Sequence, residues 1–164
     1  MIIESTNSNN RNFIATMADY DAIVAIFKQH RDIFPHVRTD YVRRMIAAGR
    51  CFFNNGIVIT FTKYIRKNKI GLNVIAPKGS ICIKQIATAN PGNGKTIGEL
   101  ENFLSMWDPN QICFLSVREN NHRAVKFYNK TGFRESGRIE WNSKNSPSGK
   151  ISGIVFSRKC MKEN

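Results

Sequence analysis

The chain has 164 residues, enough for one domain with a buried core, and its 41% hydrophobic content excludes a disordered polymer. No apolar run approaches the roughly 20 residues that a membrane-spanning helix needs, so no membrane partner is expected. Lys and Arg number 25 against 12 Asp and Glu, a net charge of +13, which favours anionic ligands such as nucleic acid or a phosphorylated cofactor. A generally basic solvated surface is an equally good explanation for any single patch.

The N-terminal residues and the cysteines indicate a cytoplasmic protein. The stretch "MIIESTNSNNR" has neither the basic region nor the apolar core of a secretory signal, so residues 1–11 are expected to be a frayed polar tail and residues 12–164 one domain. The cysteines contain no C-x-x-C pair and three lie in apolar runs, so buried thiols in a reducing compartment are expected and a metal site is not. They are Cys51, Cys82, Cys113 and Cys160.

The first half of the chain predicts a strand, two helices and a hairpin, in that order. Residues 12–17 alternate like a strand, and 19–30 and 38–49 have helical periodicity, with Asp19 as a possible cap and Gly49 as a stop. Two apolar runs around Asn55-Gly56 predict a β-hairpin, since that dipeptide suits a two-residue turn. Residues 64–80 are interpreted as a basic connection.

The second half alternates strands with helices and ends in another hairpin. Residues 81–88, "ICIKQIAT", predict a strand, which a glycine-containing loop joins to a helix with Ile97, Leu100 and Leu104 on one face. Residues 111–117 are almost continuously apolar, typical of a strand buried on both faces, and 120–133 predict a short capped helix. Two final runs, 136–142 and 149–159, predict a hairpin. This pattern predicts a mixed α/β sheet of six or seven strands.

The helix segment "NNHRAVKFYNKTGF" carries a family resemblance. Asn121, Ala124, Phe127-Tyr128 and Gly132-Phe133 match the N-x-x-A-x-x-F-Y-x-x-x-G-F segment of the GNAT acyl-CoA acyltransferases, and the order of elements from about Asn12 to Lys159 is similar to theirs. The resemblance implies a mostly antiparallel sheet, splayed in the middle, with about four helices. It also implies N-acyl transfer, with an acetyl group passing from acetyl-CoA (or another acyl-CoA) to an amine in a ternary complex.

The loop "NPGNGKTIGEL" is ambiguous when taken alone. It is either a plain turn or a phosphate-binding loop, in which glycines let backbone N–H groups converge on an anion at the start of a helix. The resemblance favours the second interpretation and places Gly94 at the family's first glycine. Pro91 then stands where Gln or Arg is usual, and Thr96 where Gly or Ala is usual.

The resemblance implies three groups of cofactor-binding residues. The strand before the loop offers backbone groups for the pantetheine arm and an oxyanion, the loop binds the pyrophosphate, and the following helix segment lines the site. The expected residues are Ile86, Ala87, Thr88, Gly92, Asn93, Gly94, Lys95, Thr96, Asn121, Ala124, Phe127 and Tyr128.

The resemblance makes Tyr128 the expected acid that protonates the leaving thiolate, since a phenol pKa of about 10 exceeds a thiol pKa of about 8.5. It can equally be a core aromatic. The general base is not identified, because the strand 81–88 holds no carboxylate. His36 is the catalytic candidate, and a loop histidine bonded to a carbonyl is the alternative interpretation. The expected acceptor-binding residues are His36, Tyr41, Ser116 and Glu140.

Two other functions stay open. A nucleobase or tRNA acceptor would suit the cationic residues Lys63, Arg66, Lys67 and Lys69. A non-catalytic binding module would suit the departures at Pro91 and Thr96. The chain is expected to be a monomer or a homodimer.

Overall fold

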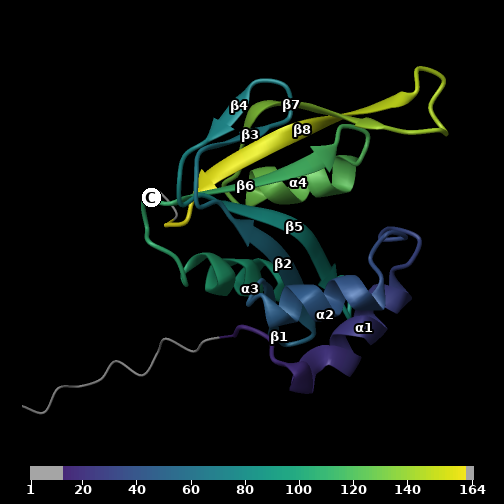
Figure 1. Cartoon of the computed structure of the whole chain (residues 1–164), viewed down its shortest axis with the longest axis vertical. Helices are drawn as coiled ribbons and strands as arrows, with labels where there is room; N and C mark the ends of the chain where they lie inside the picture. The colour runs from purple at the N-terminus through teal and green to yellow at the C-terminus, as the bar shows by residue number, and fades with distance from the viewer. Residues whose placement is uncertain (1–12, 162–164) are drawn as a thin grey trace, which may run out of the picture.

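The computed structural model describes residues 13–161, so the expected tail and residue 12 at the predicted domain boundary lie outside them. The described residues form one central six-stranded sheet, a separate two-stranded hairpin and four α-helices (Figure 1). The strands of the central sheet are β1 (Cys51–Asn54), β2 (Ile57–Lys63), β5 (Ile81–Thr88), β6 (Ile112–Arg118), β8 (Lys150–Lys159) and β7 (Arg134–Asn142), in spatial order. All neighbours are antiparallel except β5 and β6, so the mostly antiparallel mixed sheet is confirmed.

The helices cover both faces of the sheet. They are α1 (Tyr20–Gln29), α2 (Thr39–Ala47), α3 (Lys95–Leu104) and α4 (His122–Lys130). On β2, Ile57 and Ile59 join the large core beneath α3 and α4, whereas Val58 joins the core beneath α1 and α2. This division follows from the two-residue period of a strand. None of the described helices is long and apolar enough to cross a membrane.

The predicted turn between β1 and β2 is confirmed. Asn55 and Gly56 both have positive φ, 50° and 73°, as a turn that matches the twist of a hairpin requires. The helix stops are confirmed as well, since Gly49 follows α2 and Gly132 follows α4, with φ of 68° and 89°.

Three local predictions are wrong. Residues 13–17 form no strand: Ile14 makes one isolated bridge to Phe52, and a 3₁₀ turn, Met17–Asp19, follows. The Asp19 side chain does not cap α1; its Oδ2 accepts from the Thr16 N–H at 3.0 Å. The basic connection contains a hairpin of β3 (Asn68–Ile70) and β4 (Val74–Ala76), which lies beside β7 (Figure 1). The buried residues Ile70, Val74 and Ala76 hold it on the sheet, a tertiary contact that short strand patterns do not reveal.

Candidate active site

The central strands β5 and β6 separate soon after they begin. Only two register pairs join them, Ile81↔Cys113 and Cys82↔Phe114, although the strands have 8 and 7 residues. The expected splay of the sheet is therefore confirmed. The backbone of β5 beyond Cys82 has no strand partner on the β6 side and is available to a ligand that pairs as a strand does.

The end of β5 indicates which backbone groups face this gap. The Ala89 N–H donates to the Gly56 carbonyl at 2.8 Å, and successive residues of a strand turn their backbone groups to opposite sides. Ile86 and Thr88 therefore direct theirs away from β2. His30 Nε2 donates to the Thr88 carbonyl at 2.7 Å, which ties the last turn of α1 to this end of β5.

The loop after β5 places free backbone N–H groups at the start of α3. Gly92 and Gly94 adopt φ of 83° and 78°, and Gly94 is the N-cap residue of the helix. The Lys95 N–H donates to Asn93 Oδ1 at 3.0 Å. The backbone N–H groups of Thr96 and Ile97 lie in the first turn of the helix, where no intrahelical acceptor exists for them. Together with the helix dipole, such N–H groups form an anion-binding site.

Two carboxylate contacts, one of them through a buried glutamate and the other through a buried arginine, hold α3 in place behind this loop. Glu99 is 5% exposed and accepts from the side-chain amides of Asn54, Asn55 and Asn102, at 3.0, 2.8 and 3.3 Å. Two of these amides come from the end of β1 and its turn, so they fix the first half of α3 to the sheet.

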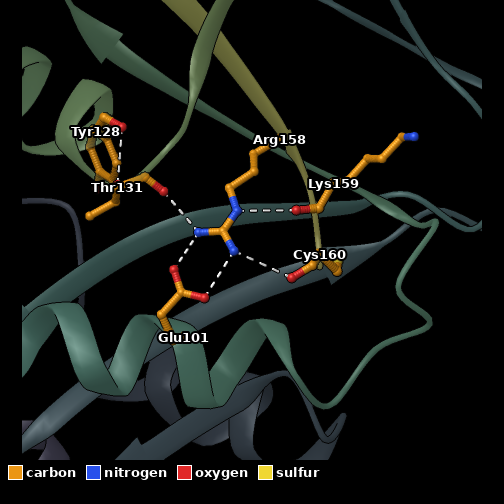
Figure 2. A network of polar contacts seen from close by, with 6 residues as sticks. All are labelled: Glu101, Tyr128, Thr131, Arg158, Lys159 and Cys160. Atoms are coloured by element: carbon orange, nitrogen blue, oxygen red, sulfur yellow. Dashed lines mark hydrogen bonds and ion pairs between the residues drawn. The ribbon is translucent and has the colours of Figure 1, made fainter. Parts of the chain in front are cut away.

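The second contact joins α3 to α4 and β8, as Figure 2 shows. The Arg158 side chain is 4% exposed and forms an ion pair with Glu101, with an Nη2–Oε2 distance of 2.9 Å. It also donates to the backbone carbonyls of Thr131 at 2.8 Å, Lys159 at 3.1 Å and Cys160 at 3.5 Å. The guanidinium thus connects the helix behind the loop with the C-terminal end of the helix that carries Tyr128.

The helix α4 presents the residues of the family-like segment. Asn121 caps it through Oδ1, which accepts the Ala124 N–H at 3.1 Å, so the expected cap is confirmed. Tyr128 is half-buried, with its ring 5.6 Å from that of Phe133 and 6.2 Å from that of Phe156. Burial, and next the nearby Cys113 thiol, raise the pKa of Tyr128 well above its ordinary value. Its hydroxyl therefore stays protonated at neutral pH, as a proton donor must.

The expected acceptor residues lie on different elements. Tyr41 on α2 donates to Gln85 Oε1 on β5 at 2.8 Å, and the same oxygen accepts from the buried Thr60 hydroxyl. His36 is exposed in the loop between α1 and α2, and Ser116 is half-buried on β6. Glu140 on β7 is exposed, with Oε2 3.4 Å from the Lys150 Nζ. The structure thus brings Tyr41 to β5. Within residues 13–161, no side-chain hydrogen bond or ion pair joins His36, Ser116 or Glu140 to Tyr41 or to Gln85.

Comparisons with known proteins identify the architecture. No protein-family model matches the chain, and no curated protein gives a significant match. Solved structures do match. A GNAT-family acetyltransferase from Bacillus cereus ATCC 10987 has a TM-score of 0.62 and 25% identity, covering 92% of this chain and 95% of its own. One from Streptococcus agalactiae 2603 has a TM-score of 0.65 and 12% identity, covering 92% and 94%.

A plant structure adds a ligand-bound relative. Arabidopsis thaliana Naa50, in complex with the bisubstrate analogue CoA-Ac-MVNAL, has a TM-score of 0.56 and 21% identity, covering 88% of this chain and 95% of its own. The chain has the GNAT fold. The resemblance drawn from Asn121–Phe133 is thereby confirmed at the level of architecture, including the splayed sheet.

Within the GNAT fold, the sequence interpretation missed several residues that shape the site. The side-chain contacts of Gln85, Glu99, Glu101 and Arg158 were not predicted, because the main partners of these residues lie far away in sequence. Gly98 is another: a Cβ at this exposed position would meet no atom within 4 Å, so a ligand can approach the first turns of α3 closely. Its place one turn after Gly94 was the available signal.

The expected cation group is divided in the structure. Lys63 Nζ lies 5.5 Å from the centre of the half-buried Trp107 ring, whereas Arg66, Lys67 and Lys69 are exposed on and before β3. All four cysteines are buried free thiols, as predicted. Within residues 13–161, no group of three or more His, Cys, Asp or Glu side chains is arranged to hold a metal ion.

Proposed function

We propose that the protein is an N-acetyltransferase that uses acetyl-CoA, or another acyl-CoA, to acylate an amine. The observation that carries this proposal is the early separation of β5 and β6 beside the N-terminus of α3. The relative Naa50 was solved with a CoA-linked analogue, which supports the same ligand class for this fold.

The residues present fit such a cofactor. The Ile86 N–H and carbonyl and the Thr88 N–H are directed into the gap, which suits the amides of an extended pantetheine arm, while His30 occupies the Thr88 carbonyl. The N–H groups of Thr96 and Ile97 and the open glycine positions 92, 94 and 98 suit a pyrophosphate, with Lys95 exposed beside them. Pro91 replaces the usual long polar side chain, so Lys95 is the cation proposed to take over its phosphate contact. The Asn121 side-chain amide is available next to α4, because capping uses only Oδ1.

The protein's own groups would then position the reactants and move protons. When bound, the acyl-CoA supplies an activated thioester, whose acyl carbon bonds to the amine nitrogen while the bond to sulfur breaks. Tyr128 would donate a proton to the leaving sulfur, and its burial keeps the hydroxyl protonated at neutral pH. The backbone N–H groups of Ile86 and Thr88 would stabilise negative charge on the acyl oxygen.

The amine must lose a proton, and β5 carries no carboxylate to accept it. We propose that the proton passes through water to His36, because an imidazole is the side chain best suited to accept a proton near neutral pH. Tyr41, held by Gln85, and Ser116 would border the acceptor. Glu140 is the weakest of the proposed acceptor residues because Lys150 already neutralises it.

Calorimetric titration with acetyl-CoA tests the proposal directly, with adenosine as the control ligand. We expect a Kd in the micromolar range, which corresponds to a binding free energy of about −8 kcal/mol, and no heat of binding from adenosine. Absence of binding at millimolar acetyl-CoA would refute it. Binding without turnover on any amine would instead support a non-catalytic module.

The role of Tyr128 needs a matched pair of variants. Tyr128→Phe should lower kcat by about 10²-fold or more while sparing acetyl-CoA affinity, because only the proton donor is lost. Tyr64→Phe removes the same hydroxyl from another half-buried tyrosine, packed beneath the β3–β4 hairpin, and should keep kcat. Equal kcat values for Tyr128→Phe and the parent would exclude Tyr128 as the sole acid.

Four buried free thiols support the expected cytoplasmic location.

A further inference from the structure

A cavity of about 410 Å³ lies between α1 and α2. Its buried side is apolar, formed by Val24, Phe27 and Val42, which are at most 9% exposed. Its rim carries three exposed cations, Lys28 on α1, Arg31 in the following loop and Arg38 at the N-cap of α2. An apolar floor with a cationic rim is suited to a ligand that combines anionic groups with an uncharged body.

Among residues 13–161, no carboxylate forms an ion pair with these three cations. The ion pairs described for residues 13–161 use Arg138, Lys150 and Arg158, and none involves a cation of the cavity. Asp32 and Asp40 lie near in sequence and are exposed, but neither forms an ion pair with these three side chains. The three positive charges are therefore available to a ligand.

The cavity belongs to elements that reach the candidate active site. The residue that follows α1, His30, donates to the Thr88 carbonyl at the end of β5, and Tyr41 on α2 donates to Gln85 on the same strand. The loop between α1 and α2 also carries His36. In Figure 1 this loop and the turn between β7 and β8 project from the same side of the molecule. A ligand held at the cavity would thus lie next to His36, whose neighbours Pro35 and Val37 line the cavity.

The excess of positive charge extends well beyond the cavity. Between Cys51 and Gly98 the chain contains no Asp or Glu and seven basic residues: Lys63, Arg66, Lys67, Lys69, Lys78, Lys84 and Lys95. One phosphorylated cofactor does not need so large a cationic surface. A polymer of phosphates is attracted by such a long-range positive field, whichever of the cations it contacts directly.

We propose that the acceptor amine is carried by a nucleic acid, whose phosphates Lys28, Arg31 and Arg38 hold at the cavity between α1 and α2. This inference rests on the proposed function, and it names the acceptor class. The apolar floor would accept the sugar or base between successive phosphates. The chemistry is unchanged: the nucleic-acid amine would bond to the acyl carbon and lose its proton through water to His36, while the carbon–sulfur bond breaks and CoA leaves as the thiol with a proton from Tyr128.

Fluorescence anisotropy with a labelled 20-nucleotide single-stranded DNA, at 50 to 200 mM salt, tests this inference on the full chain. We expect binding that weakens steeply with salt. The variant Lys28→Gln/Arg31→Gln/Arg38→Gln should weaken binding at least tenfold at 100 mM salt and reduce the slope of log K against log salt by about 2, since each lost phosphate contact removes about 0.7. The matched control, Arg66→Gln/Lys67→Gln/Lys69→Gln, removes the same charge from the β3–β4 hairpin and should reduce the slope less.

Three results would overturn the inference. They are no DNA binding at 50 mM salt, equal losses in the two triple variants, and competition by a poly-glutamate peptide as strong as that by unlabelled DNA. The second would mean that only net charge matters, and the third would indicate an acidic protein as the partner. Acetyl-CoA titration of the same preparation reports the proposed function separately, so intact cofactor binding without DNA binding would overturn this inference alone.

Discussion

The contact between Glu101 and Arg158 allows a double-mutant cycle with a predictable asymmetry. The Arg158 side chain is 4% exposed, whereas the Glu101 side chain is 37% exposed. Removing one partner costs free energy according to what is left behind, because an unpaired charge is tolerated only where water can reach it. Glu101→Gln leaves a buried guanidinium without a counter-charge. Arg158→Met leaves a carboxylate that water can solvate.

The expected magnitudes follow from the same contacts. Glu101→Gln should lower the free energy of unfolding by about 3 kcal/mol, at the lower end for a broken buried pair because Glu101 is itself partly hydrated. Arg158→Met should cost about 2 kcal/mol, since the backbone carbonyls of Thr131 and Cys160 lose a buried donor. The double variant should cost about the same as Arg158→Met alone. The coupling energy is therefore expected to be about 3 kcal/mol.

Urea unfolding at pH 7 measures each corner of the cycle, with the slope m compared to verify that the unfolding reaction is unchanged. Glu119→Gln is the matched control. Its partner Arg138 is 48% exposed, so that variant should cost less than about 1 kcal/mol. Additive losses from the two single variants, or a loss below 1 kcal/mol for Glu101→Gln, would refute the view that α3 and α4 are joined through a buried, charge-dependent contact.

Two further predictions concern the backbone and the thiols. Gly71→Ala should cost more than about 2 kcal/mol, because φ is 64° and a Cβ would lie 2.4 Å from the Arg138 carbonyl oxygen, whereas Gly149→Ala, with φ of 74° and open space, should cost about 1 kcal/mol; equal urea midpoints for the two would exclude the close contact. Burial, and next the charge of Asp19, raise the pKa of the Cys51 thiol from 9.0 to about 12. Above pH 9 the unfolded chain loses this proton first, so Cys51 should make stability fall by up to about 1.4 kcal/mol per pH unit between pH 9 and 12. Cys51→Ala should flatten that decline in urea titrations at pH 8 to 10.5, and an unchanged slope would contradict the assignment.

Much of the fold could be predicted because local signals agree with the tertiary structure. Asn55-Gly56 can form a tight turn wherever apolar strands flank it, and Asn121 caps α4 by accepting from a backbone N–H only three residues away. The alternation on β2 and the continuous apolar run of β6 reflect how their side chains are buried. These patterns depend on neighbours along the chain, so the sequence by itself determines them.

Contacts between distant residues decided the rest. The segment after residue 12 alternates like a strand, yet its backbone makes only an isolated bridge to Phe52. The strands β3 and β4 are too short for their apolar pattern to be recognised without the sheet that they cover. The ties from Glu99 to the β1–β2 turn and from Glu101 to Arg158 join residues 44 to 57 positions apart, and no local periodicity records such pairs. The candidate site itself depends on how far β5 and β6 stay paired, which is set by packing on both faces of the sheet. The sequence determined which elements form, and only the tertiary structure decided where β5 and β6 separate and which side chains surround the gap.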